Sequence, residues 1–157
     1  MMLLIKPLTT LDLDVVLVNS SVTKRKYIGS YPSCTKPETN KKIYAFISNT
    51  DDHNKAGQHW CAWVVNRDTI SFFDSFGRDP WDTTLPINFQ KIVEDYDHVQ
   101  YTTTRIQDWS SKTCGYFCVH FIYTLCLGLD YENFLREYSK NLLYNDYIAF
   151  DFFNSLI

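Results

Sequence analysis

The sequence predicts an α+β fold, in which a short mixed or antiparallel sheet packs against a buried central helix, with further helices flanking both. Two β-rich runs, Trp60–Val65 and Thr69–Asp74, surround a short polar turn and predict a β-hairpin. The segment Cys114–Leu127 is apolar on nearly every face, which is typical of a buried helix. Since 45% of the 157 residues are hydrophobic, we expect residues 1–157 to form a single domain with one substantial core.

The elements before the hairpin are predicted from capping signals and from alternation. The segment Thr10–Ser20 is expected to form a short helix, capped by Thr9 or Thr10, with Asp12 near its first turn. A loop rich in Pro, Thr and Lys and a polar loop at 49–57 indicate connections that face solvent. Two extended segments are predicted in this half of the chain, Tyr27–Ser30 and Ile43–Ser48.

Periodicity predicts the elements after the hairpin. Apolar residues at helical spacing indicate a helix at Asn88–Asp95. Alternation and β-branched residues indicate a strand at His98–Gln107. After the central helix, Tyr131–Phe153 is expected to form one or two helices packed outside it.

Charge and hydropathy argue against several classes of protein. The net charge is −3 and the pI about 5.7, whereas a domain built to bind nucleic acid is usually basic. The N-terminus lacks the pattern of a signal peptide, and no window approaches the roughly 18 apolar residues of a membrane span. One candidate patch for phosphate contacts combines Thr23–Lys26 with Lys36, Lys41 and Lys42.

The five cysteines, an odd number, indicate free thiols in a reducing compartment. Cys114 and Cys118 form a C-x-x-x-C pattern with His120 nearby, which resembles part of a zinc site. A second ligand pair at a finger-like spacing is missing, so core thiols explain the pattern better and no metal is expected.

Cys114 differs from the other cysteines because it opens the apolar helix after a segment rich in Ser and Thr. Its thiol is therefore expected to face unpaired backbone N–H groups at the positive end of the helix dipole. Both features favour the thiolate, which is the reactive form. The neighbouring Gly115 is expected to leave the space over the sulfur open for a substrate backbone. Cys118 and Cys126, inside the helix, fit the description of core thiols.

His59 and Asp74 are the candidate partners of this thiol. His59 lies at the entry of the first hairpin strand, and histidine titrates in the range that a proton-transferring base needs. Asp74 ends the second strand, where Asp is uncommon. If Asn66 pairs with Thr69, Cys61 lies opposite Asp74. His59 then follows two residues on along the same face, within reach of the carboxylate, whereas another register would separate the two.

Gln107 completes the candidate set, seven residues before Cys114. Its side-chain amide can donate to the oxyanion that forms when a thiolate attacks a carbonyl, with the backbone N–H of Cys114 as a second donor. Taken alone, each candidate has a plainer explanation: a core cysteine, a surface histidine, a turn-capping aspartate or an exposed glutamine. Together, the four residue types at the ends of separate elements form the parts of one thiol-protease site.

Three segments of the sequence resemble a known family of proteases. The segments "GQHWCAWVV", "ISFFDSFG" and "QDWSSKTCGYFCVHFIYTLC" resemble the adenovirus protease (adenain) and its relatives in adenovirus-like viruses and virus-like transposons. More distantly, they resemble the SUMO and ubiquitin-like-protein proteases, which share His-Trp, the Asp and a Gln before Cys-Gly. The six residues between Gln107 and Cys114 match the adenovirus type. The resemblance covers Lys26–Gly128.

The resemblance implies a role for each candidate. Cys114 would be the nucleophile and His59 the general base and acid. Asp74 would orient His59, and Gln107 would be the oxyanion donor. Trp60 would line a narrow channel suited to small residues, so that cleavage sites contain Gly. Adenain has Glu at the position of Asp74, whereas the cellular relatives have Asp.

The resemblance also concerns cofactors, partners and location. The chemistry needs no cofactor, but adenain is activated by a disulfide-linked viral peptide and by DNA. An activating peptide, with Cys34 and Cys61 as candidate attachment points, and DNA are therefore implied by resemblance only. So are virion precursor proteins as substrates, and the host nucleus or cytoplasm and the virion as locations, with no membrane.

Two other functions stay open at this point. One is a deubiquitinase or deSUMOylase of the related cellular fold. The other is a non-catalytic structural or binding module with free core thiols.

Overall fold

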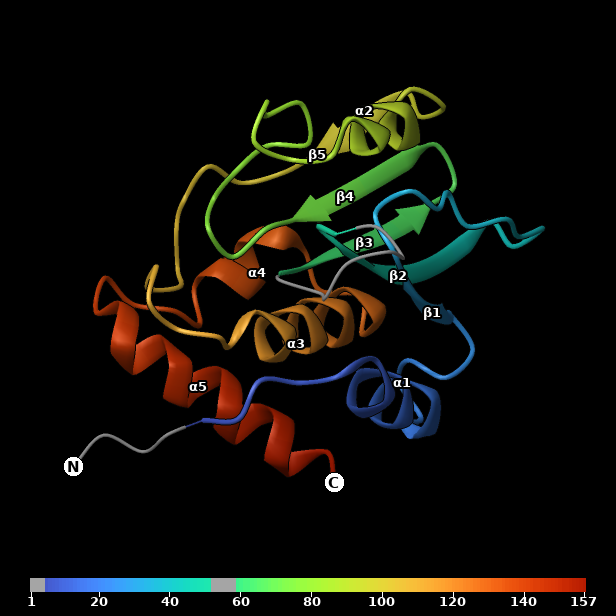
Figure 1. Cartoon of the computed structure of the whole chain (residues 1–157). Helices are drawn as coiled ribbons and strands as arrows, with labels where there is room; N and C mark the ends of the chain where they lie inside the picture. Colours follow the sequence, from blue (N-terminus) through green and yellow to red (C-terminus); the bar gives the residue numbers. More distant parts are fainter. Residues whose placement is uncertain (1–4, 52–58) are drawn as a thin grey trace.

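A five-stranded mixed sheet in the order β1-β2-β3-β4-β5 forms the centre of the protein (Figure 1). This computed structural model describes residues 5–51 and 59–157. The three central strands are antiparallel, whereas the two edge strands lie parallel to their neighbours. The strands are β1 (Tyr27–Tyr31), β2 (Ile43–Asn49), β3 (Trp60–Asn66), β4 (Thr69–Phe73) and β5 (His98–Gln100).

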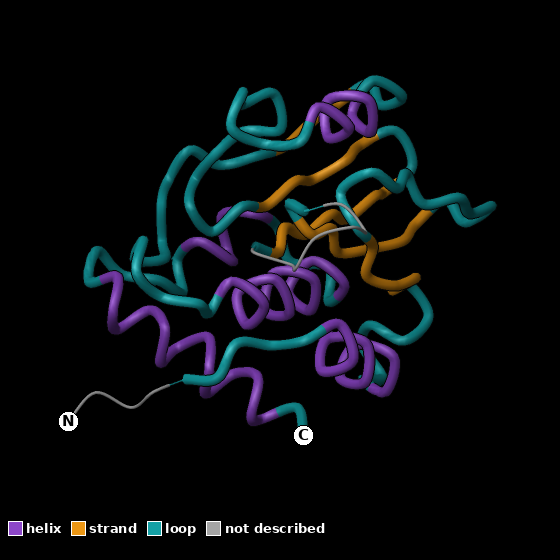
Figure 2. Tube along the Cα trace, viewed as in Figure 1, coloured by secondary structure: helices purple, strands orange, loops and turns teal. Residues whose placement is uncertain are grey.

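Helices cover both faces of this sheet, which confirms the predicted α+β class. In Figure 1, α2 lies on one side of the sheet, and α3 lies on the other with α1, α4 and α5 around it. Figure 2 shows that most of the helical structure is on the α3 side, and that a long loop connects β5 to α3. The helices are α1 (Thr10–Asn19), α2 (Ile87–Val93), α3 (Cys114–Cys126), α4 (Tyr131–Leu135) and α5 (Leu142–Ser155).

Alternation along the central strands divides the core into two layers. On β3, Ala62 and Val64 belong to the layer that includes α3, while Trp63 and Val65 belong to the layer that includes α2. Both sides of β3 are buried, so its apolar run is nearly continuous. The α3 layer contains most of the residues of that helix, which explains why α3 is apolar on nearly all faces.

The predicted hairpin register is confirmed. Asn66 pairs with Thr69, and Ala62 pairs with Phe73. Arg67 in the turn has φ 59°, the left-handed conformation that a two-residue hairpin turn requires. At the N-terminus, Thr9 and Asp12 form the reciprocal capping box of α1, so the predicted helix start is also confirmed.

The strand predicted at His98–Gln107 is wrong in its length, because β5 ends at Gln100. Its three residues pair with the start of β4. The chain then leaves the sheet, and the backbone N–H groups of Ile106 and Gln107 donate to the carbonyl of Ser75 in the loop after β4. The β-branched residues at 102–104 therefore form a loop that packs against another loop.

The remaining predictions agree with the structure to within a few residues. The helix expected at Asn88–Asp95 is α2, and the segment Tyr131–Phe153 forms two helices, α4 and α5. Most of the polar loop predicted at 49–57 lies outside the described residues. Within the described residues, no helix combines the length and apolar character needed to cross a bilayer.

Candidate active site

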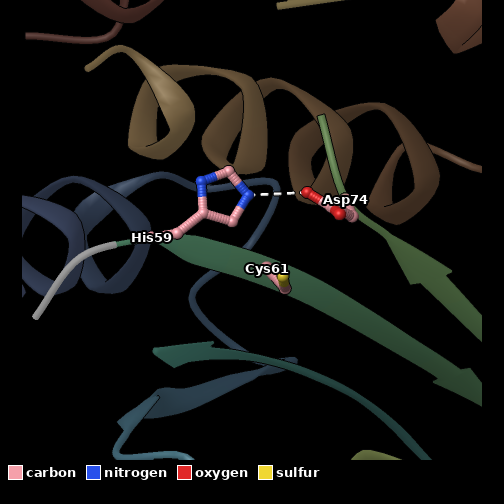
Figure 3. A group of neighbouring side chains, drawn as sticks. All are labelled: His59, Cys61 and Asp74. Carbon is pink, nitrogen blue, oxygen red and sulfur yellow. Dashed lines mark hydrogen bonds and ion pairs between the residues drawn. The ribbon is translucent and has the colours of Figure 1, made fainter. Parts of the chain in front are cut away.

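The open end of the β3–β4 hairpin brings His59 and Asp74 together. Nε2 of His59 lies 2.6 Å from Oδ1 of Asp74 (Figure 3). The contact follows from the register, because extending the Ala62–Phe73 pairing by one residue places Cys61 opposite Asp74. His59 stands just before β3 and reaches diagonally across the hairpin, as predicted.

Cys114 is the first residue of α3, and its sulfur lies beside the same end of the hairpin. The backbone N–H of Trp60 donates to Sγ of Cys114 over 3.4 Å. Cys114 is also close enough to His59 to raise the pKa of the imidazole. Since Nε2 of His59 faces Asp74, Nδ1 is the nitrogen left for the sulfur, and Figure 3 shows it on the far side of the ring from Asp74. One ring nitrogen is therefore occupied by the carboxylate, and the other is available to the thiol.

The pKa of His59 is set by this pair of neighbours. Burial alone lowers the pKa of the ring, which is only 6% exposed, because it disfavours the charged form. The hydrogen bonds and charges of Asp74 and Cys114 outweigh burial and raise the pKa to about 9. The imidazole is therefore mostly protonated near neutral pH.

Asp74 is held by three donors and is almost completely buried, at 1% exposure. Besides His59, Oδ1 accepts the backbone N–H of Phe76 at 3.1 Å, and Oδ2 accepts Nε of Arg78 at 2.6 Å. Burial alone raises the pKa of Asp74, but His59 and Arg78 lower it below its usual value. The bond to Phe76 also shows that Asp74 caps the following turn. The plainer explanation of this residue therefore holds, and the same carboxylate also contacts His59.

Gln107 is fully buried in the loop before α3, and two partners fix its amide. Its Oε1 accepts the hydroxyl of Ser75 at 2.5 Å, and its Nε2 donates to the carbonyl of Ser111 at 2.9 Å. The Ser111 carbonyl only accepts, so it requires Nε2 on its own side. Gln107 lies on the loop that leads into Cys114, and one of its amide hydrogens is left for another acceptor.

Several residues of the site were missed by the sequence analysis. Arg78, Ser75 and Ser111 hold the predicted residues, and Asn145 of α5 donates to the carbonyl of Ile106 at 3.0 Å, one residue before Gln107. Their spacing from the predicted residues carries no recognisable pattern. Only the short distance from Asp74 to Arg78, four residues along a turn, could have suggested a pair.

Trp60 and Gly115, the predicted substrate-binding residues, are fixed by the N-terminal segment. The indole N–H of Trp60 donates to the carbonyl of Leu8 at 3.2 Å. A Cβ built on Gly115 would lie 3.1 Å from Cβ of Leu8 and 3.4 Å from Leu13. Close packing against Leu8 is therefore a reason for glycine at this position that the sequence analysis did not give.

Cys118, Cys126 and His120 are buried in the core, as expected, and Cys61 is buried as well. Cys61, Cys118 and Cys126 are buried thiols, and burial raises the pKa of each. Nδ1 of His120 lies 2.5 Å from the hydroxyl of Tyr138, in a pocket of aromatic rings. Because it is buried, Cys61 is also unsuited to a disulfide with an incoming peptide, whereas Cys34 is exposed.

His59, Cys61 and Asp74 form the one group of potential metal ligands among residues 5–51 and 59–157 (Figure 3). Their chemistry does not fit a metal. Both oxygens of Asp74 already accept hydrogen bonds, and burial holds the pKa of Cys61 far above the range in which it would be a thiolate. Charge pairing between the carboxylate, His59 and Arg78 explains the cluster fully.

Comparison with known proteins places this fold. No family model matches the sequence, and no curated protein matches it. The structure is similar to the crystal structure of ASFV pS273R protease, with a TM-score of 0.61, 16% identity, and coverage of 92% of this chain and 66% of that chain. The selenomethionine form of the same protease matches with a TM-score of 0.60, 17% identity, and coverage of 92% and 67%.

A weaker likeness, with a TM-score of 0.37 and 16% identity, is to the SUMO protease Ulp1, covering 73% of this chain and 54% of that one. The present chain spans about two thirds of the length of the ASFV protease. The likeness to that protease concerns the fold, and it agrees with the protease-type α+β fold predicted from the sequence.

Proposed function

We propose that this chain is a cysteine endopeptidase in which Cys114 is the nucleophile and His59 the general base and acid. Asp74 orients and charges the imidazole, and Gln107 donates to the oxyanion. The main support is the bond between Asp74 and His59 at the end of the hairpin, next to the thiol of Cys114 at the start of α3. The similarity in fold to a viral protease is consistent with it.

The proposed reaction proceeds in two steps. The thiolate of Cys114 attacks the peptide carbonyl carbon, forming a C–S bond, and the oxyanion accepts hydrogen bonds from Gln107 and the backbone N–H of Cys114. The C–N bond then breaks, and the leaving amine takes a proton from His59. In the second step His59 removes a proton from water, which attacks the thioester carbon. The C–S bond breaks, releasing the acid and restoring the thiolate.

The charge on His59 suits this role. A protonated imidazole near the sulfur supplies the proton that the leaving amine needs. Asp74 stabilises that imidazolium, and Arg78 keeps Asp74 ionised. Arg78 and Asp74 also hold the ring in the orientation that leaves Nδ1 for the sulfur.

The finer expectations remain proposals based on resemblance. They are virion precursor proteins as substrates, cleavage at small or Gly-containing sites, and a reducing compartment in an infected nucleus or cytoplasm. An activating peptide or DNA belongs to the same group. The positive charge of the basic patch predicted from the sequence is partly neutralised, because Lys36 forms an ion pair with Asp95.

The test of this function compares two cysteine variants of α3. A mixture of peptides from a digested proteome is incubated with the purified protein, and new cleavage sites are read by mass spectrometry. Cys114→Ala should abolish all new cleavage, whereas Cys126→Ala, which removes a thiol at the other end of the helix, should retain it. Wild-type cleavage by the Cys114→Ala protein, purified identically, would refute the assignment.

Alkylation separates this proposal from a non-catalytic module. Near neutral pH, iodoacetamide should modify Cys114 faster than Cys34, although Cys34 is exposed and Cys114 is buried. His59→Ala should remove that advantage. Slow alkylation of Cys114, at or below the rate of Cys34, would favour a binding module without catalysis.

A further inference from the structure

Four side chains form a stack that leads from the candidate base to the surface. The rings of His59 and Phe76 are stacked with centroids 4.4 Å apart and an interplanar angle of 12°. Phe76 in turn contacts Trp109, with centroids 4.6 Å apart and an angle of 35°. The guanidinium of Arg105 lies 4.7 Å from the ring of Trp109. The stack joins the hairpin end to the loop that precedes α3.

Trp109 is the exposed member of this stack. Its side chain is 62% exposed, although its contacts with Phe76 and Arg105 hold it in place. An aromatic side chain that is both exposed and held by its neighbours offers a large apolar area to a ligand at little cost in conformational entropy. Among the described tryptophans, Trp81 is also exposed, at 44%, but it pairs edge-on with Tyr101 away from His59.

The segment that leads into Trp109 is held against the loop after β4. A Cβ on Gly77, which has φ 76°, would lie 2.8 Å from the backbone of Arg105 and of Thr103, so the loop after β4 and the 103–107 segment are in close contact. A terminal nitrogen of Arg105 donates to the carbonyl of Gln107 at 3.1 Å. Trp109 is therefore positioned relative to Gln107 and His59 by backbone contacts.

The proposed chemistry indicates which part of a substrate meets this surface. The leaving amine must receive its proton from Nδ1 of His59, so the chain after the scissile bond passes the side of the sulfur where His59 lies. Trp109 lies there too, behind Phe76 and in the loop between Gln107 and Cys114. A substrate segment that passes His59 and continues along the stack toward the indole therefore begins with the residue after the scissile bond.

We propose that Trp109 binds the side chain of the residue after the scissile bond and selects a large apolar side chain there. Phe76 is a positioning residue, since it touches His59 on one side and supports Trp109 on the other. The charges beside Trp109 have opposite signs, Arg105 and Asp108, so the surface offers apolar area without net charge. This inference rests on the proposed peptidase function.

The experiment reads cleavage sites from the same proteome-derived peptide mixture. In the wild-type protein, Phe, Leu and other large apolar residues should be enriched directly after the scissile bond. Trp109→Ala should lower the preference for Phe over Gly at that position about tenfold, the effect of losing one aromatic contact. Trp109→Phe should retain most of the preference. Trp81→Ala, the matched loss of an exposed indole elsewhere, should leave the preference unchanged.

Failure of this inference and failure of the proposed function give different results. Cleavage that depends on Cys114 but shows no apolar preference after the scissile bond would overturn the role of Trp109 and leave the peptidase intact. A preference that Trp81→Ala reduces as much as Trp109→Ala would also overturn it. If no cleavage depends on Cys114, the peptidase function is wrong, and the inference is wrong with it.

Discussion

The two buried histidines, one at the end of the hairpin and one in the middle of α3, differ in the direction of their pKa shifts. His59 and His120 are 6% and 7% exposed, and both lie against aromatic rings. Nevertheless the pKa of His59 is raised to about 9, whereas burial lowers the pKa of His120 to about 4. Burial acts in the same direction on both. The difference comes from the partners, a carboxylate and a thiol for His59 and a phenol for His120.

In this protein a buried imidazole carries a charge where an acidic partner is buried with it, and stays neutral where none is. The hairpin end provides such a partner, because Asp74 is itself compensated by Arg78. The middle of α3 provides Tyr138 and aromatic rings, which stabilise a neutral ring. Proton transfer at neutral pH is therefore expected at His59 and not at His120.

The largest effect is expected from Asp74→Asn, which removes the feature that distinguishes His59 from His120. An amide cannot stabilise the imidazolium, so the pKa of His59 should fall below its present value. We expect kcat/KM for peptide cleavage to fall on the order of 10³-fold. NMR titration of the imidazole and steady-state kinetics measure the two effects.

The control for this change is Asp14→Asn, which alters a carboxylate that accepts the hydroxyls of Tyr27 and Ser30 and makes no described contact with His59 or Cys114. It should leave both the pKa of His59 and the kinetics close to the wild type. Unchanged kinetics in Asp74→Asn would remove Asp74 from the site.

The free energy of unfolding should be largest near pH 6.5 and decrease on both sides. The raised pKa of His59 contributes stability that is complete below 6.5 and is lost as the pH rises through about 9. The lowered pKa of His120 contributes stability that is complete above 6.5 and is lost as the pH falls through about 4. Each step corresponds to roughly 3 kcal/mol at most. Urea unfolding at pH 4, 6.5 and 9 measures both.

Single variants assign the two sides of this profile. His120→Phe should flatten the profile between pH 6.5 and 4, and His59→Ala should flatten it between 6.5 and 9. His98→Gln, a change of an exposed histidine, should leave both sides unaltered. If the free energy of unfolding of the His120→Phe protein falls as steeply between pH 6.5 and 4 as that of the wild type, the assignment to His120 is wrong.

A smaller effect is expected from Arg78→Gln, which leaves Asp74 in place but removes the guanidinium bound to Oδ2. Loss of this charged hydrogen bond should raise the pKa of Asp74 and lower kcat/KM about tenfold. Arg78→Lys should recover part of the activity, because lysine restores the charge but not the fixed Nε–H. The control is Arg25→Gln, at an exposed arginine. Equal activity of the Gln and Lys variants would show that the charge of Arg78 does not matter.

The smallest effect on catalysis is expected from His120→Phe. His120 contacts Tyr138, Phe134 and Phe152 and is not connected to Cys114 by a described hydrogen bond, so its replacement should change kcat/KM by less than about twofold. The loss should appear as reduced stability at pH 6.5, because the Tyr138 hydroxyl loses its partner. A large loss of kcat/KM in a folded His120→Phe protein would mean that the two histidine regions are coupled.

The sequence predicted most of what brings His59 and Asp74 together. The pattern of β-rich runs and a short turn specified the hairpin, and the side-chain period of two fixed which residues share a face. The apolar run after Cys114 specified α3 and placed the thiol at its first residue. These are local properties of the chain, and local patterns are what a sequence displays directly.

The same reasoning misjudged the segment after β5 and did not predict the neighbours of Gly115. Alternation at 101–107 predicted a strand, but β4 ends after Phe73 and its loop pairs with Ile106 and Gln107 instead. Gly115 packs closely against Leu8, which is distant in sequence. Whether a β-prone segment finds a strand partner depends on what packs beside it, and intrinsic propensity does not contain that information.

The elements, the hairpin register and the candidate reactive groups could thus be predicted from the sequence. The contact of Arg78 with Asp74, the bonds of Ser75 and Ser111 to Gln107, and the exposed position of Trp109 next to Phe76 became visible only in the folded chain. Hydrogen-bond partners, burial and charge depend on how loops meet in space. Hydrophobic periodicity specifies helices and strands, but it does not specify how the loops between them meet.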